Sequence, residues 1–266
     1  MSKEKEIKKD ASLNKQEITP SAFKVIVREF KKDKLATFSL AFLTLIILTV
    51  FIGSMFFDVE EVMKVNLMDS FLRPGEGGYV LGTDQAGRSL LGQLFIGTRN
   101  SIIIGASVTV LTNVIGIIVG LIIGYYGGIV DNIIMRIIDF IQVLPILMLI
   151  IVFVTLVPSY NMVTFVFIMS IFYWVGIARL VRSKALSEGR RDYISASKTM
   201  GTPAWKIMFG GILPNISSIL IISAILDLAG NMGIEIGLTF LGFGLPPGVP
   251  SLGTLINKAL DPTILR

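Results

Sequence analysis

The chain has 266 residues, of which 53% are hydrophobic and only 16% are charged, and its mean hydropathy is +0.75. A soluble domain of this length cannot bury so much apolar surface in one core, so the composition predicts an integral membrane protein. Cysteine and histidine are both absent, which excludes disulfides, thiolate nucleophiles, and thiolate or imidazole metal ligands. We therefore expect this chain to bind no metal ion and no cofactor of its own.

Residues 1–34 form a polar leader that we expect to be a tail followed by a helix on the membrane surface. The first 20 residues are rich in Lys and Glu, which is typical of a disordered segment. From Ser21 onward, one helical face carries Phe23, Ile26, Val27 and Phe30. This pattern predicts an interfacial helix, and the alternative is a merely basic flank of the first membrane span.

Five apolar runs are long enough to cross a bilayer, which requires about 20 residues in helical form. They cover residues 35–57, 102–125, 133–157, 162–181 and 212–243. The first run lies too far from the N-terminus, and is too long, to be a cleaved signal peptide. The sequence therefore predicts an all-α integral membrane protein with five transmembrane helices.

The basic residues follow the membrane topology. Ten Lys and Arg residues precede residue 35 and six lie within 182–206, whereas residues 58–99 contain four against six acidic residues. The positive-inside rule then places the N-terminus and residues 182–211 in the cytoplasm and residues 58–101 outside a cell membrane. Since orientation accounts for the basic charge, we do not expect a nucleic-acid partner.

The sequence divides into an N-terminal tail, residues 1–34, the first span, residues 35–57, an external segment, residues 58–101, and a core, residues 102–266. The helix predicted from residue 102 is rich in small residues, which permit close packing between membrane helices. These residues are Gly105, Ala106, Ser107, Gly116, Gly120 and Gly124.

Residues 182–211, which we call the elbow, can form two short helices. Tyr193, Ala196 or Ser197, and Met200 share one face of the first, and Gly201 can end it in the left-handed conformation. We expect Thr202 to be the N-cap of the second helix and Pro203 its first residue.

The second short helix of the elbow is expected to present Trp205, Met208 and Phe209, with no core beneath them. Leu213 and Pro214 would then start the next membrane helix. Apolar side chains at this spacing fit a helix that docks into a groove of a partner protein. The alternative is that the aromatic residues lie against the membrane interface.

Polar residues also interrupt the fifth span. Asp227, Asn231 and Glu235 are four residues apart and form one stripe, with about 12 Å along the helix axis between the two carboxylates. Because acids are costly at the bilayer centre, the stripe should face protein or a watery cavity. It either lines a path through the membrane, contacts another membrane protein, or has a purely structural role.

Four further charged residues lie near the ends of spans. Asp131, Arg136 and Asp139 fall near the start of the third span, where we expect them to snorkel or to pair, and Arg179 is expected to anchor the fourth span at the interface.

Several motifs resemble the C-type permease of binding-protein-dependent ATP-binding-cassette importers, in the oligopeptide, dipeptide and nickel group. The spacing of Ser195-Ala196-Ser197, Gly201 and Leu213-Pro214 matches the "EAA" loop of such permeases. The chain also contains "LGTDQAGR" at 81–88, "GTRNS" at 97–101, "YYGG" at 125–128 and "EIGLTFLGFGLPPGVPSLG" at 235–253, in the order of the family. The resemblance spans residues 23–258 and singles out Gly82, Thr83, Asp84, Gly87 and Arg88 in the external motif.

The resemblance implies the type I importer fold, also called MetI-like, and a permease subunit that forms half of a translocation pathway for oligopeptides or dipeptides. It also implies a homologous permease as heterodimer partner, two cytoplasmic ATPase subunits that carry ATP and Mg, and an extracytoplasmic substrate-binding protein. In this picture the elbow is the coupling helix that docks on the ATPase. No G-x-x-x-x-G-K-[S/T] stretch occurs, so ATP hydrolysis is expected on the partners and not on this chain.

The chain departs from the family pattern at three positions and at its end. Ser195 stands where the family usually has Glu, Ser197 where it has Ala, and Ser89 where an acid commonly follows Gly-Arg. The family continues into a final membrane helix beyond the point where this sequence stops, so we expect a C-terminally incomplete chain.

Three other functions remain open on sequence alone. Asp227 and Glu235 could couple protons in a secondary transporter. The chain could also be a membrane scaffold without transport activity. An intramembrane enzyme is the least favoured, because the residues form no convergent catalytic set.

Overall fold

A computed structural model describes residues 32–158 and 160–260. The interfacial helix expected at residues 23–30 lies outside the described residues. Among the residues that are described, the regular structure is helical, apart from one isolated bridge between Thr83 and Ser89. The chain divides into two compact units, residues 1–49 and residues 50–266, which we describe separately.

The first predicted span forms helix α3, Lys34–Ser54, most of which belongs to the first unit. The Asp33 carboxylate caps its first turn by accepting hydrogen bonds from the backbone N–H groups of Leu35 and Ala36, at 3.0 and 3.1 Å. Twenty-one helical residues extend for about 31 Å, which matches the hydrocarbon thickness of a bilayer.

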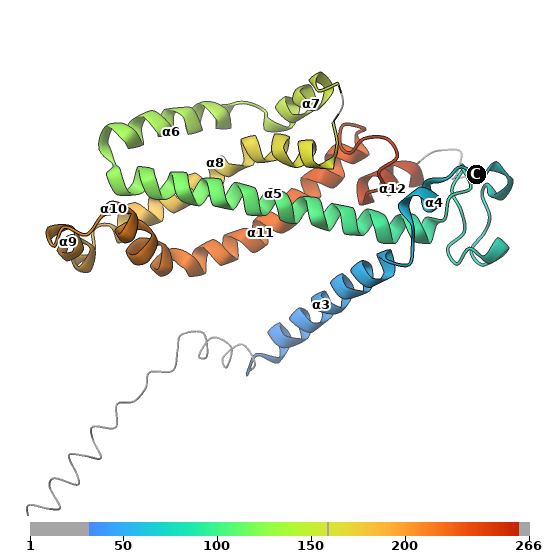
Figure 1. The fold of residues 1–266 in the computed structure, drawn as a ribbon, viewed down its shortest axis with the longest axis horizontal. Helices are drawn as coiled ribbons and strands as arrows, with labels where there is room; N and C mark the ends of the chain where they lie inside the picture. The colour runs from blue at the N-terminus through green and yellow to red at the C-terminus, as the bar shows by residue number, and fades with distance from the viewer. Residues whose placement is uncertain (1–31, 159, 261–266) are drawn as a thin grey trace, which may run out of the picture. The chain divides into compact units, whose positions relative to one another are not determined.

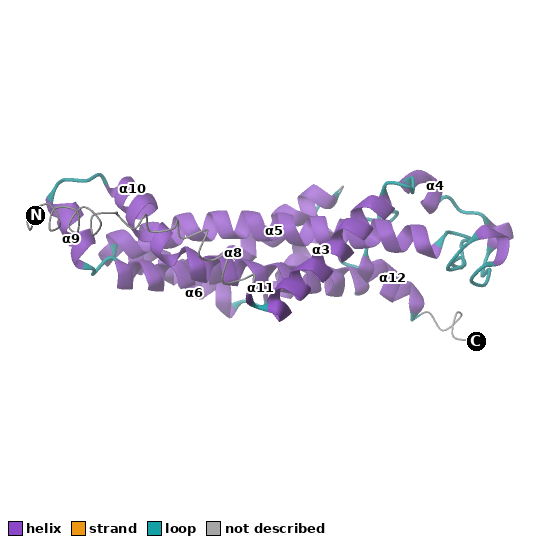
Figure 2. Ribbon diagram, turned by 90° about the horizontal axis from the view of Figure 1, so that it is seen from below, coloured by secondary structure: helices purple, strands orange, loops and turns teal. Residues whose placement is uncertain are grey.

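Three long helical runs lie side by side in the second unit (Figures 1 and 2). They are α5, Leu90–Tyr126, α8, Met162–Glu188, and the continuous run Ala204–Phe240, which comprises α10, Ala204–Lys206, the π-helix η3, Ile207–Ile212, and α11, Leu213–Phe240. Helix α5 begins at Leu90 and not near residue 102, so Gly92 and Gly97, which were assigned to the external segment, lie inside this long helix.

The small residues of α5 bring it close to α8, as predicted. A Cβ at Gly120 would lie 2.7 Å from the carbonyl oxygen of Ala178, and one at Gly116 would lie 2.9 Å from that of Trp174. A Cβ at Gly124 would meet the Cβ of Ala185 at 2.6 Å. Helices α5 and α8 therefore pack backbone to backbone along three successive turns.

The third predicted span is broken into α6, Gly128–Val143, and α7, Ile146–Leu156, which meet at an angle of 83°. Pro145 causes the break because it lacks an N–H group and keeps the preceding residue, Leu144, in an extended conformation. The described residues thus contain four helices long and apolar enough to span a membrane, or five if this bent pair counts as one span.

Ion pairs join α6 to α8. Arg182 binds both carboxylate oxygens of Asp131, and Arg179 binds Asp139. Asp131 and Asp139 were expected either to snorkel or to pair, and both pair. Arg179 was expected to anchor the fourth span at the interface, and the structure adds Asp139 as its acidic partner.

The short elements of the second unit gather at its two ends (Figure 1). Helix α9, Asp192–Thr199, lies with α10 in the elbow. The opposite end, which we call the loop end, comprises residues 58–89 and 241–260. Its elements are α4, Val59–Met63, the turns η1, Leu67–Asp69, and η2, Glu76–Gly78, and α12, Leu252–Ala259.

Helix α12 packs closely on the end of α11. A reciprocal capping box between Ser251 and Thr254 starts it, and a Cβ at Gly253 would lie 2.5 Å from the carbonyl oxygen of Ile236. This contact fixes α12 near the residues of the external motif.

Candidate functional site

The elbow packs on a hydrophobic core that it shares with α5, α8 and α11. Ile194 of α9 packs with Ile207, Met208 and Ile212 of η3, and this cluster continues into α5 and α8. The expectation that no core lies beneath the elbow was therefore wrong. Met208, expected at the surface, is only 7% exposed, because η3 turns this side chain toward the cluster.

Large apolar side chains nevertheless remain on the outer surface of the elbow. Trp205 is 63% exposed, Met200 77% and Phe209 45%. Ser195 and Ala196 are exposed as well, whereas Ser197 is half-buried and donates its hydroxyl to the carbonyl of Tyr193. A rigid base with an exposed tryptophan is the geometry expected of a docking surface.

Gly201 ends α9 in the left-handed conformation as predicted, with φ of +76°. The next helix starts one residue later than expected. Pro203 is its N-cap, with extended backbone angles, and Thr202 precedes the cap and makes no side-chain capping bond. Thr202 instead donates its backbone N–H to the carbonyl of Ser197 at 3.1 Å, which closes the turn between the helices.

Helix α11 begins at Leu213 with Pro214 in its first turn, as predicted, but it is not a separate helix, because the helical run is continuous from Ala204. The π-helix η3 lies immediately before it, and Leu213 donates to the carbonyl of Met208, five residues back. Proline cannot donate to the carbonyl four residues before it and clashes with that group, and the wider π-turn accommodates the ring. The second half of the elbow is thus the first part of the long helix that contains α11.

Tyr193 links the elbow to two long helices. Its hydroxyl donates to Glu188 Oε1 of α8 at 2.6 Å and accepts from Asn215 Nδ2 of α11, also at 2.6 Å. Burial raises the pKa of Tyr193, and the adjacent Glu188 carboxylate raises it further. A third link is the Lys198 ammonium group, 4.8 Å above the ring of Tyr125 at the end of α5. Sequence reasoning placed Tyr193 on the surface of α9 but missed Asn215, since its partner is 22 residues away.

The polar stripe of α11 faces α5. Asn231 Nδ2 donates to Thr109 Oγ1 of α5 at 2.9 Å, and both residues are buried. Glu235 is fully buried, with Oε1 accepting from Thr239 at 2.9 Å and Oε2 without a hydrogen-bond partner among the described residues. The expectation that these two residues face protein is confirmed.

Asp227 differs from the rest of the stripe because it borders a cavity. It is half-buried, faces the Asn113 amide of α5, and accepts a long hydrogen bond from Ser223. The cavity measures about 400 Å³ and is also lined by Gln142 and Tyr173. Helices α6, α7, α8 and α11 all contribute to it, so Asp227 presents a carboxylate to a space between helices.

The external motif folds into a tight loop that depends on its glycines. Gly82 and Gly87 have φ of +76° and +72°, and a Cβ on either would collide with a backbone carbonyl, that of Leu72 or that of Asn66. Between them, the Thr83 hydroxyl donates to the carbonyl of Asp69 and accepts from the N–H of Leu72.

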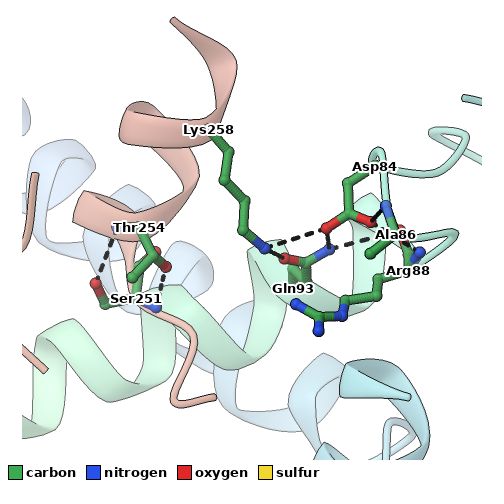
Figure 3. A network of polar contacts seen from close by, with 7 residues as sticks. All are labelled: Asp84, Ala86, Arg88, Gln93, Ser251, Thr254 and Lys258. Atoms are coloured by element: carbon green, nitrogen blue, oxygen red, sulfur yellow. Dashed lines mark hydrogen bonds and ion pairs between the residues drawn. The ribbon is translucent and has the colours of Figure 1, made fainter. Parts of the chain in front are cut away.

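Asp84 is the centre of a buried network at the loop end (Figure 3). Its Oδ1 accepts from the backbone N–H groups of Ala86 and Arg88, both at 2.9 Å. Its Oδ2 accepts from Gln93 Nε2 and from Lys258 Nζ, both at 3.1 Å. Burial alone would raise the pKa of Asp84, but the Arg88 N–H, the Lys258 ammonium and the Gln93 amide together hold it below its ordinary value.

Lys258 and Gln93 were missed by sequence reasoning. They lie on α12 and α5, and Lys258 also donates to Gln93 Oε1 at 2.7 Å. The network therefore ties the external motif to the start of α5 and to α12. Among the described residues, no group of three or more carboxylate, imidazole or thiolate side chains could hold a metal ion.

Comparison with known proteins adds two family matches. Residues 116–265 match the family "Binding-protein-dependent transport system inner membrane component", and residues 21–74 match the "N-terminal TM domain of oligopeptide transport permease C".

Three similar proteins illustrate the relationship. The oligopeptide transport system permease protein OppC of Lactococcus lactis subsp. lactis is 50% identical over 237 residues, which cover 89% of this chain and 81% of that protein. AmiD of Streptococcus pneumoniae, also an oligopeptide transport system permease protein, is 36% identical, with 89% of this chain and 77% of that protein covered. The dipeptide transport system permease protein DppC of Lactococcus lactis subsp. cremoris is 36% identical, with 70% and 54% covered.

Proposed function

Because this chain belongs to the family of inner membrane components of binding-protein-dependent transport systems, we propose that it is a permease subunit of an ATP-driven oligopeptide importer. It forms half of the translocation pathway and pairs with a homologous permease. Two ATPase subunits in the cytoplasm bind ATP and Mg, and an extracytoplasmic binding protein delivers the peptide. This chain performs no chemistry itself.

The exposed Trp205 on a rigid elbow is the observation that carries this proposal. In a helix-in-groove contact, an aromatic anchor on a fixed base transmits a displacement instead of absorbing it. Tyr193 and its partners Glu188 and Asn215 provide that fixed base. Closure of the ATPases would then move the elbow together with α8 and α11, which is how alternating access can be driven from outside the membrane.

The proton-coupled alternative receives less support from the site. A proton relay needs groups that water can reach in turn. Glu235 is fully buried, is hydrogen-bonded to Thr239, and does not line the cavity at Asp227.

Co-purification of the ATPase subunits with this chain in detergent tests the proposal. The double substitution Trp205→Ala and Phe209→Ala should weaken their binding at least about 30-fold, because truncating an aromatic anchor costs roughly 2 kcal/mol or more. The matched control is Phe167→Ala, an aromatic that is 56% exposed on α8, which should retain the ATPases. Failure of the unaltered chain to bind any ATPase, with the partner permease co-expressed, would reject the proposal.

The absence of cysteine allows a direct test of orientation. In the proposed topology, a single cysteine replacing Lys198 in the elbow reacts with an impermeant maleimide only after the cells are opened. A cysteine replacing Gln85 in the external motif reacts in intact cells. Both positions are exposed in the structure, so a reversed pattern would mean that the orientation is wrong.

A further inference from the structure

The Arg88 side chain is the unexplained part of the external motif. Its backbone is held firmly, since its N–H donates to Asp84 Oδ1 and its carbonyl accepts from the Asp84 N–H at 3.0 Å. The guanidinium makes no hydrogen bond and no ion pair among the described residues, and its Nε is buried. In Figure 3 the side chain extends past Gln93, and no dashed line reaches the guanidinium. A fixed arginine with its donors unused is prepared to bind an anion from outside the chain.

A pocket of about 300 Å³ lies beside this guanidinium. Arg88 and Lys258 line it together with Tyr160 and the Gly-Pro-rich loop 242–250, and no Asp or Glu is among the described residues that line it. A neighbouring larger cavity, which Arg88 also borders, is lined by two acids, Asp58 and Glu61, and by one further cation, Lys64. The electrostatic balance therefore favours an anion in the smaller pocket over one in the larger cavity.

Arg88 lines this pocket with guanidinium N–H groups that make no hydrogen bond to the described residues. The Lys258 ammonium already binds Asp84 and Gln93, and the Tyr160 hydroxyl donates to the carbonyl of Gly244 at 2.8 Å. The remaining wall is largely apolar, with Leu245 and Val249 among its residues. Two parallel N–H donors beside an apolar wall fit a planar carboxylate that is attached to a hydrophobic group.

We propose that Arg88 binds the C-terminal carboxylate of the peptide substrate in this pocket, as the peptide passes from the binding protein into the pathway. This inference rests on the proposed function, which makes a peptide the substrate. The pocket is at the lower end of the size of small-molecule sites, so it accommodates the end of a peptide and not an extended chain. The carboxylate of a free chain end enters such a recess more easily than a carboxylate on a folded surface.

A thermodynamic cycle on peptide uptake tests the proposal. The complete transporter, with partner permease, ATPases and binding protein, is reconstituted in liposomes, and kcat/KM is measured for one peptide with a free C-terminus and for its C-terminal amide. Because the same binding protein serves every arm, its own preference cancels when unaltered chain and Arg88→Gln are compared. Amidation should cost the unaltered chain about tenfold more than it costs Arg88→Gln, as expected for loss of one charge-assisted pair.

Arg99→Gln is the matched control. Arg99 also has a buried Nε without a partner, but it lines neither the pocket nor the larger cavity, so the amidation penalty should remain that of the unaltered chain. Thermal unfolding of each variant verifies that the fold is intact, which we expect because the Arg88 guanidinium makes no hydrogen bond or ion pair with the described residues.

Two results would overturn the inference while leaving the proposed function in place. The first is an amidation penalty that Arg88→Gln does not change. The second is an equal loss of uptake for both peptides, which would assign Arg88 to docking of the binding protein. Absence of ATP-dependent uptake of both peptides by the unaltered chain would reject the proposed function itself, and the inference with it.

Discussion

Lys258→Met is the substitution that tests the loop end most directly. The ammonium group lies 3.1 Å from Asp84 Oδ2 and 2.7 Å from Gln93 Oε1, while the Asp84 side chain is only 3% exposed. Methionine keeps most of the apolar stem of Lys258 but removes its charge. Asp84 is then left as a buried carboxylate without a cation.

Breaking a buried ion pair from one side costs roughly 3 to 5 kcal/mol. The cost here should lie below that range, at about 2 kcal/mol, because Lys258 is 26% exposed and Asp84 keeps its hydrogen bonds from the backbone of Ala86 and Arg88. For a chain of this size, such a loss lowers the midpoint of thermal unfolding by roughly 5 °C.

The assay is thermal unfolding in detergent, measured for a double-mutant cycle. Adding Asp84→Asn to Lys258→Met should restore more than half of the lost stability. The Gln93 amide, freed from Lys258, can flip so that its Oε1 accepts a hydrogen bond from the new asparagine, and no charge is then buried without a partner. Lys64→Met, which removes an exposed lysine at the same end, should change the midpoint by less than about 1 °C. Strictly additive effects of the two network substitutions would refute the reasoning, since Lys258 would then not stabilise the Asp84 charge.

Three further predictions concern packing, the polar stripe and pH. Gly120→Ala should destabilise the chain by about 1 to 3 kcal/mol in thermal unfolding, because the new Cβ would meet the backbone of α8. The control Gly230→Ala should be neutral or stabilising, because no atom lies within 4 Å of its new Cβ. Glu235→Gln should preserve ATP-dependent uptake, because the amide oxygen can still accept a hydrogen bond from Thr239 and a neutral side chain costs less to bury. Loss of uptake with normal ATPase binding would instead favour a proton-coupled role for Glu235. The pKa of Asp84 is lowered in the folded state. The Asp84 carboxylate therefore contributes its full stabilisation above its ordinary pKa of about 3.9, and this stabilisation is lost as the pH falls through the folded pKa. The difference in unfolding midpoint between the unaltered chain and Lys258→Met should accordingly shrink below about pH 4.

The membrane helices could be predicted from sequence because hydropathy and length determine them almost alone. The start of α5 at Leu90 was missed, although it carries a local signal: the Ser89 hydroxyl caps the helix by accepting a hydrogen bond from the Gly92 N–H. The need for glycine at position 97 has no local signal, because it comes from the backbone of Ser251, which lies 3.0 Å from where a Cβ would be. The bend at Leu144 and Pro145 did carry a local signal, a proline inside an otherwise helical run.

The site residues show the same division between local and distant information. The left-handed Gly201 follows from glycine chemistry and was predicted correctly. Whether Trp205 or Met208 faces solvent depends on the π-turn before Pro214 and on the core that receives Met208, so helical spacing alone could not decide it. The partnership of Lys258 with Asp84 joins residues 174 positions apart, a distance over which one sequence gives no pairing information.

Helix α11 provides the physical connection between the two ends of the core unit. At its start, Asn215 binds Tyr193 of the elbow, and near its other end Asn231 binds Thr109 of α5. A helix is stiff along its axis, so a force applied at the elbow is carried along it unless its hydrogen-bond ladder yields. The π-helix η3 lies in the chain between Trp205 and Asn215. Tyr193 bypasses it, because its hydroxyl binds both Glu188 of α8 and Asn215 of α11. We therefore expect a partner docked on the elbow to shift α8 and α11 together, which would alter the cavity at Asp227 that these two helices line together with α6 and α7.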